Sequence, residues 1–103
     1  MTDSIVAGEV RIPGLPGQIH FGPVFLSDEE RDELFADLDA RRVRVVWNVQ
    51  DDRSSHVEEA AHFEAAIWTP IDDYSVPEDR AGFVRDLDRV IALLQAGQNV
   101  YVH

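Results

Sequence analysis

Apolar residues along the 103-residue chain recur with two different periods, and together these predict alternating strands and helices. Short apolar runs bounded by turn residues are typical of strands, whereas apolar residues three and four positions apart are typical of one helix face. The predicted strands cover residues 9–12, 18–21, 43–49, 67–71 and 99–103. The predicted helices cover residues 27–42, 55–66 and 77–97. This alternation of elements favours an α/β fold.

Two of the predicted strands are expected at the centre of the sheet. Residues 43–49, V-R-V-V-W-N-V, form a nearly continuous apolar run that suits a strand buried on both faces. Residues 99–103, N-V-Y-V-H, follow a helix that Gly97 can close. Because connections are short and crossovers right-handed, we expect these strands to be neighbours in a mostly parallel sheet of four or five strands with flanking helices. Residues 1–103 are predicted to form one domain.

Capping residues predict where the helices begin. Ser27 with Glu30, and Ser55 with Glu58, have the spacing of a capping box. Pro77 suits the first turn of the last helix. The apolar positions of that helix, which recur with helical period, are Phe83, Val84, Leu87, Val90, Ile91 and Leu94.

Composition narrows the possible partners and chemistry. Nine basic residues against twenty acidic ones give a net charge of −11, which argues against nucleic acid or an anionic membrane as a partner. The sequence shows neither the opening of a signal peptide nor an apolar run of about 20 residues, so we expect a cytoplasmic protein. With no cysteine, these residues contain no thiol nucleophile and no thiolate metal site.

The histidines do not suggest a metal centre. His56 and His62 are six positions apart, and this spacing does not place two imidazoles on one helix face for zinc. His20 lies in a predicted strand, where a half-buried structural role is expected. We therefore predict no metal and no cofactor.

The ending V-Y-V-H resembles the strand that leads into the H-C-x-x-G-x-x-R signature of protein tyrosine and dual-specificity phosphatases, with His103 as the first signature residue. The segment T-P-I-D-D-Y-S-V-P, about thirty residues earlier, resembles the acidic loop of the same family. Asn48, at the end of the run L-D-A-R-R-V-R-V-V-W-N-V, matches a third family segment. The resemblance covers Glu9 to His103, so we expect a phosphatase-like domain that is incomplete at its C-terminus, before the nucleophilic cysteine.

The resemblance implies a role for three residues. Asp73 would be the general acid that protonates the leaving oxygen, and Asp72 would shape the loop or the acidity of Asp73. His103 would orient the phosphate-binding loop and favour the cysteine thiolate. The substrate would be a phosphorylated protein or another phosphate monoester, hydrolysed through a phosphocysteine intermediate.

Three other interpretations stay open at this point. The chain could be a truncated or pseudo-phosphatase module that binds a partner without turnover, and the 103 residues alone are expected to be inactive. It could instead be an unrelated α/β domain, such as a rhodanese-like one. Asp72 and Asp73 could also be simply a solvated turn that leads into a helix.

Overall fold

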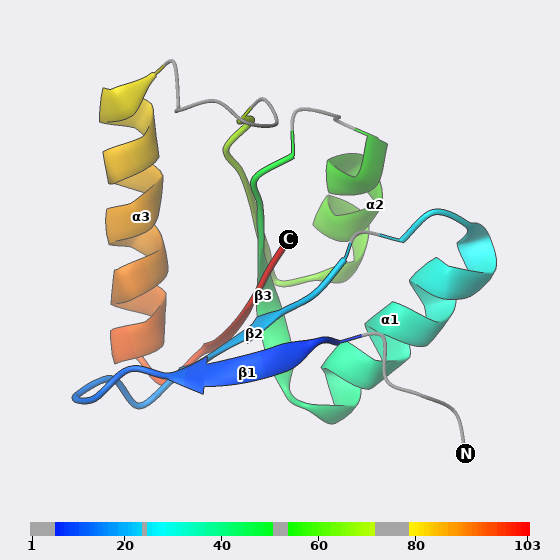
Figure 1. The fold of residues 1–103 in the computed structure, drawn as a ribbon, viewed down its shortest axis with the longest axis horizontal. Coiled ribbons are helices and arrows are strands. Elements are labelled where there is room, and N and C mark those ends of the chain that lie inside the picture. Colours follow the sequence, from blue (N-terminus) through cyan, green and yellow to red (C-terminus); the bar gives the residue numbers. More distant parts are fainter. Residues whose placement is uncertain (1–5, 24, 51–53, 72–78) are drawn as a thin grey trace.

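The computed structural model describes residues 6–23, 25–50, 54–71 and 79–103. These residues form an α/β fold with a mixed, mostly parallel five-stranded sheet and three helices (Figure 1). The strands are β1 (Gly8–Arg11), β2 (Gln18–Phe21), β3 (Val43–Asn48), β4 (Ala65–Trp68) and β5 (Asn99–Val102). The helices are α1 (Asp28–Ala40), α2 (Ser54–His62) and α3 (Arg80–Gln95). The predicted α/β class with a mostly parallel sheet is therefore confirmed.

The sheet has the strand order β1-β2-β5-β3-β4, with β5 in the middle. β5 pairs in parallel with β2 on one side and with β3 on the other, and β3 pairs in parallel with β4. β1 is antiparallel to β2 and forms one edge. The prediction that residues 43–49 and 99–103 are adjacent at the centre is confirmed.

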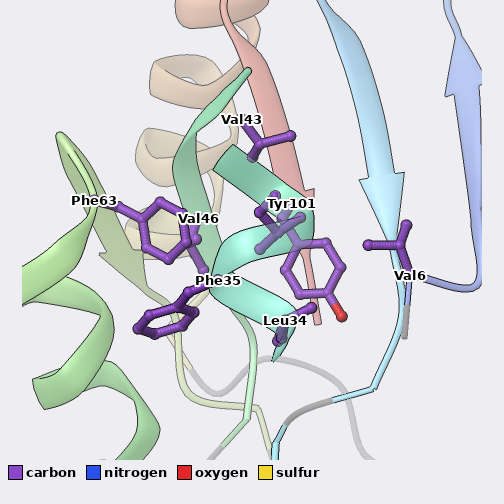
Figure 2. Close-up of a cluster of buried hydrophobic side chains, with 8 residues drawn as sticks. Val6, Leu34, Phe35, Val43, Val46, Phe63 and Tyr101 are labelled. Carbon is purple, nitrogen blue, oxygen red and sulfur yellow. The ribbon is translucent and has the colours of Figure 1, made fainter. Parts of the chain in front are cut away.

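Helices cover both faces of the sheet, α1 and α2 on one side and α3 on the other (Figure 1). Under α1 and α2 lies a cluster of buried side chains (Figure 2): Val6, Leu34, Phe35, Leu38, Val43, Val46, Phe63 and Tyr101. On the α3 side a second cluster contains Val45, Trp47, Ile67, Val90, Leu94 and Val100. The two faces arise because neighbouring residues of β3 and β5 point to opposite sides of the sheet.

The first helix begins as its sequence predicts. The hydroxyl of Ser27 accepts a hydrogen bond from the Glu30 amide at 3.1 Å, and the Glu30 carboxylate accepts one from the Leu26 amide at 2.9 Å. After the helix, Arg42 has a φ of 60°, in the left-handed region that usually selects glycine or asparagine. Arginine at this position therefore carries backbone strain.

The second predicted capping box is wrong. α2 begins at Ser54, so Ser55 lies inside the helix, and its hydroxyl accepts a hydrogen bond from the Asn48 side chain at 2.9 Å. The helix also ends at His62 rather than near Ala66, and the next strand covers Ala65–Trp68 rather than residues 67–71. The reason is that Ala65 and Ala66 pair with β3, although alanine has a low strand propensity.

The last helix differs from its prediction only at its start. α3 begins at Arg80, because the Asp79 carboxylate accepts the Gly82 amide at 2.9 Å and acts as the N-cap. Pro77, where the helix was predicted to open, lies outside the described residues. The predicted end at Gly97 is confirmed: its φ is +88°, and the amides of Gly97 and Gln98 donate to the carbonyls of Leu94 and Leu93.

The chain passes very close to this turn just before β2. The Gly17 amide donates to the Leu94 carbonyl at 2.9 Å, and a Cβ at Gly17 would lie 2.0 Å from the Gln98 carbonyl oxygen. We expect Gly17→Ala to lower the free energy of unfolding by about 3 kcal/mol, as measured by urea denaturation, because two backbone segments must separate.

Gly14→Ala is the control for this substitution. Gly14 also has a φ of +88°, but no atom lies within 4 Å of an added Cβ, so only the backbone conformation opposes alanine. That cost is about 1 kcal/mol. Equal losses in the two variants would contradict a steric role for Gly17.

His20, on β2, is buried more deeply than the half-buried position predicted from sequence, with 2% of its surface exposed. Among the described residues neither ring nitrogen has a hydrogen-bond partner, and Glu9 Oε2 lies 3.8 Å from Nδ1. Burial lowers the pKa of His20 below its ordinary value of 6.5, and Arg41 lowers it further, whereas Glu9 and Asp37 oppose the shift.

This lowered pKa predicts acid sensitivity. The unfolded chain binds the His20 proton more readily than the folded chain, so stability is retained above about pH 6.5 and falls as the pH drops below it. We expect the unfolding free energy of the wild type to fall more steeply from pH 7 to pH 5 than that of His20→Phe, whose ring does not titrate. Parallel pH curves for the two proteins would show that His20 is not responsible.

Candidate functional site

Four polar side chains meet inside the protein at the carboxyl ends of the central strands. Asn48 ends β3, His103 follows β5, and Ser55 and Glu59 belong to α2. All four residues are buried, with exposed fractions between 0% and 7%. We call these four residues the buried polar cluster.

Local periodicity places these side chains on one face. Residues two apart on a strand share a face, so Asn48 points to the same side as Val46, and His103 to the same side as Tyr101. Ser55 and Glu59 are four residues apart on α2 and therefore lie on one side of the helix. Because α2 packs on that face of the sheet (Figure 1), the four side chains converge.

Hydrogen bonds connect every member of the buried polar cluster. His103 Nε2 lies 2.6 Å from Glu59 Oε2, and Asn48 Nδ2 donates to Glu59 Oε1 at 3.2 Å and to Ser55 Oγ at 2.9 Å. The Asn48 side-chain oxygen accepts the Gln50 amide at 2.9 Å. The side chains of His103 and Glu59 are 0% and 1% exposed, so their interaction acts where water does not screen it.

The contact with Glu59 also distinguishes the two nitrogens of the His103 ring. A proton lies between Nε2 and the carboxylate, whereas Nδ1 is buried without a partner among the described residues. The ring of Tyr101 lies beside it, with centroids 5.7 Å apart, and the Tyr101 hydroxyl donates to the Pro23 carbonyl at 2.6 Å. Burial raises the pKa of Tyr101, and the charges of Glu59 and Asp37 raise it further, so the hydroxyl keeps its proton.

Of the three predicted site residues, the structure describes one. His103 lies in the buried polar cluster, whereas Asp72 and Asp73 lie outside the described residues. The segment that leads toward them starts at the same edge of the sheet, because β4 and β5 both run parallel to β3. With neighbouring strands about 4.8 Å apart, the ends of β4 and β5 are separated by about 10 Å.

Thr69 anchors the start of that segment. Its amide donates to the Asn48 carbonyl at 2.8 Å, which continues the pairing beyond β4. Its hydroxyl accepts from Trp47 Nε1 at 2.8 Å and donates to Asp86 Oδ2 on α3, also at 2.8 Å. The chain just after β4 is thus fixed to both the sheet and α3.

Glu59 is the residue that sequence reasoning missed. A glutamate in an acidic chain is usually solvent-exposed, and its neighbour Glu58 is indeed on the surface, 40% exposed and 3.1 Å from Arg31. The available signal was helical spacing, since Ser55, Glu59 and the buried Phe63 are each four residues apart. That spacing places Glu59 on the core face of α2.

Other site types find little support in the described part of the chain. No group of three or more His, Asp or Glu side chains there could hold a metal ion. His56 stacks on Trp68 with centroids 5.6 Å apart, and His62 Nε2 contacts the Asp39 carboxylate at 3.1 Å. None of the described helices has the length and apolar character needed to cross a membrane.

Comparisons with known proteins assign no family. No protein-family model matches the chain, and a search of curated proteins finds no match. The functional argument therefore depends on the geometry of the site and on the motifs in the sequence.

Removing Glu59 should be costly for the fold. We expect Glu59→Ala to lower the unfolding free energy by about 3 kcal/mol, because it leaves the buried His103 ring without its partner and the Asn48 amide with Ser55 as its acceptor. Glu59→Gln should lose less, since the glutamine carbonyl can still accept one of the two hydrogen bonds. Urea denaturation measures both changes.

Glu58→Ala is the matched control on the same helix. Its ion pair with Arg31 is partly exposed to water, and we expect its loss to cost much less than the loss of Glu59. If Glu59→Ala were no more destabilising than Glu58→Ala, the buried polar cluster would not contribute to stability.

Proposed function

We propose that the chain provides the sheet, the structural histidine and the acidic loop of a cysteine-based phosphatase of the tyrosine or dual-specificity type. In this proposal the domain continues beyond His103 with the signature residues C-x-x-G-x-x-R. The substrate is a phosphorylated protein or another phosphate monoester.

The observation that carries the proposal is the position of His103. It follows the central strand β5 and is buried, and its Nε2 is hydrogen-bonded to Glu59 Oε2 at 2.6 Å. In α/β sheets, ligand sites form at the carboxyl ends of the strands. A residue that follows His103 would therefore lie at the expected location of a ligand site. The buried polar cluster fixes the end of the strand that leads to it.

The topology of the sheet supports the assignment of the acid. Thr69 and His103 start two segments from the same edge, with β3 between them. Asp72 and Asp73 are three and four residues after Thr69, a distance that can span the roughly 10 Å between the strand ends. A general acid on this segment could therefore reach a leaving group held above β5.

The proposed reaction has two displacement steps. The cysteine thiolate attacks phosphorus, the S–P bond forms, and the bond from phosphorus to the leaving oxygen breaks as Asp73 protonates that oxygen. Water then attacks the phosphocysteine, and the S–P bond breaks to release phosphate and the thiolate. Backbone amides, a helix N-terminus and the signature arginine would hold the phosphate during both steps.

Within this mechanism Glu59 positions His103. Its carboxylate binds Nε2, so Nδ1 is the ring nitrogen left to interact with the nucleophile loop. A buried, fixed imidazole next to the cysteine would orient the loop and favour the thiolate. Asn48 and Ser55 fix Glu59 in turn.

The decisive test extends the chain through the signature loop and compares Asp73→Asn with Asp72→Asn. If Asp73 is the acid, its substitution should slow phosphoenzyme formation by about 100-fold to 10,000-fold. The loss should be largest for substrates with poor leaving groups, because these need their departing oxygen protonated. Rapid-quench measurements on aryl phosphates of graded leaving-group pKa provide the rates.

The controls separate the possible outcomes. The 103-residue chain should hydrolyse no aryl phosphate, because it contains no cysteine. A larger, leaving-group-dependent loss in Asp72→Asn would exchange the roles of the two aspartates. If the extended chain binds phosphorylated protein but has no turnover, the proposal of catalysis fails and a binding module remains.

A further inference from the structure

A cleft lies at the opposite end of the parallel strands, where β3 begins. Its volume is about 300 Å³, within the lower range of small-ligand pockets, and its lining residues are Asp39, Arg42, Val43, Arg44 and His62. β3 rises about 3.3 Å per residue, so Val43 is about 16 Å from Asn48 and the buried polar cluster. The cleft is therefore separate from the candidate active site.

Two guanidinium groups in this cleft have no partner among the residues that the structure describes. The chain has nine basic residues against twenty acidic ones, and Arg42 and Arg44 are both exposed. Within the described part of the chain neither side chain makes an ion pair or a hydrogen bond, unlike Arg31, which contacts three carboxylates. The two arginines are available to an external anion.

The acidic residue of the cleft is already engaged. Both Asp39 carboxylate oxygens lie 3.1 Å from His62 Nε2, and the His62 ring stacks on Phe35 with centroids 4.6 Å apart. These contacts fix the imidazole at the cleft wall and direct the negative charge of Asp39 toward it. The unpaired charge that remains in the cleft is positive.

The backbone at Arg42 has a strained conformation. Its φ of 60° is unfavourable for a residue with a side chain, and glycine would avoid this strain. Arg44 is exposed because the pairing of β3 with β5 shifts register between Val43 and Val45. Strain and a register irregularity together bring two arginines to one cleft, a pattern typical of functional positions.

We propose that this cleft binds a phosphate group, either free phosphate or the phosphate of a phosphorylated protein segment. Guanidinium groups form paired hydrogen bonds to tetrahedral oxyanions, and two of them can hold one dianion. The site goes beyond the proposed catalysis and does not depend on it. For a phosphorylated protein it would act as a docking site on the edge opposite the reaction.

Arg42 and Arg44 have another conceivable role, compensation of the negative C-terminal end of α1. The amides of Arg41 and Arg42 already donate to the carbonyls of Asp37 and Asp39 at this end. Compensation predicts a loss of stability without these arginines but no phosphate binding. The two roles therefore differ in a direct binding measurement.

The test is an NMR titration of the 103-residue protein with inorganic phosphate, at constant ionic strength maintained with chloride. We expect saturable amide shifts at residues 42–44 and 62, with a dissociation constant on the order of 1 mM. Arg42→Gly and Arg44→Gln should each weaken binding about tenfold. Arg42→Gly also relieves the backbone strain, so weaker binding in that variant cannot result from unfolding.

Arg89→Gln is the matched control, because Arg89 is also exposed but lies on α3. It should bind phosphate as the wild type does. Absence of saturable shifts at the cleft, or unchanged affinity in both cleft variants, would overturn the proposal. Equal weakening in Arg89→Gln would also overturn it, since the effect would then be one of overall charge.

A second titration distinguishes the two sources of the phosphate. A peptide with one phosphoserine is compared with its unphosphorylated form and with inorganic phosphate. Binding of the phosphopeptide at least tenfold tighter than phosphate, and lost in Arg44→Gln, identifies a protein segment as the partner. Equal affinity for phosphopeptide and phosphate identifies a site for small phosphate compounds.

Discussion

The fold depends on the pairing of β5 with both β2 and β3. These parallel pairings join residues 99–102 to strands that lie more than 50 residues earlier in the chain. Parallel strands need long crossover connections. The centre of this sheet therefore forms only when α3, which precedes β5 in the chain, has packed so that β5 lies between β2 and β3. The same pairings bury Val100 and Tyr101 completely, one in each of the two hydrophobic clusters.

The buried polar cluster is a consequence of this arrangement. Once β5 lies beside β3, Asn48 and His103 reach the same edge and the same face, under α2. Polar groups in such a place are costly unless they are hydrogen-bonded, and Glu59 provides acceptors for both. The resulting network ties α2 to the central strands by directional bonds, which apolar packing alone does not provide.

The two edges of the sheet have different chemistry. At the carboxyl edge, a histidine and a glutamate are buried, and the Thr69 hydroxyl donates to Asp86. At the amino edge, two exposed arginines lie beside an imidazole in an otherwise acidic protein. In a parallel sheet the amino and carboxyl ends of the strands are separated by the length of a strand, about 16 Å here. One small domain therefore has room for two distinct sites.

The sequence by itself determined the elements with strong local signals. The apolar run at residues 43–49, the cap at Ser27 and the glycine stop at Gly97 each appear where predicted, because a few neighbouring residues decide them. The same signals predicted the α/β class and the adjacency of the two central strands. His103 was placed at a strand end for the same reason.

Tertiary structure decided what local signals leave open. Ala65 and Ala66 form a strand because they pair with β3. Ser55 is a buried acceptor because the Asn48 side chain lies within hydrogen-bond distance of its hydroxyl. Glu59 resembles any surface glutamate in the sequence, and only the packing of α2 on the sheet places it within 2.6 Å of a histidine 44 residues away. Contacts of this kind depend on the positions of whole elements, and no short stretch of sequence encodes those positions.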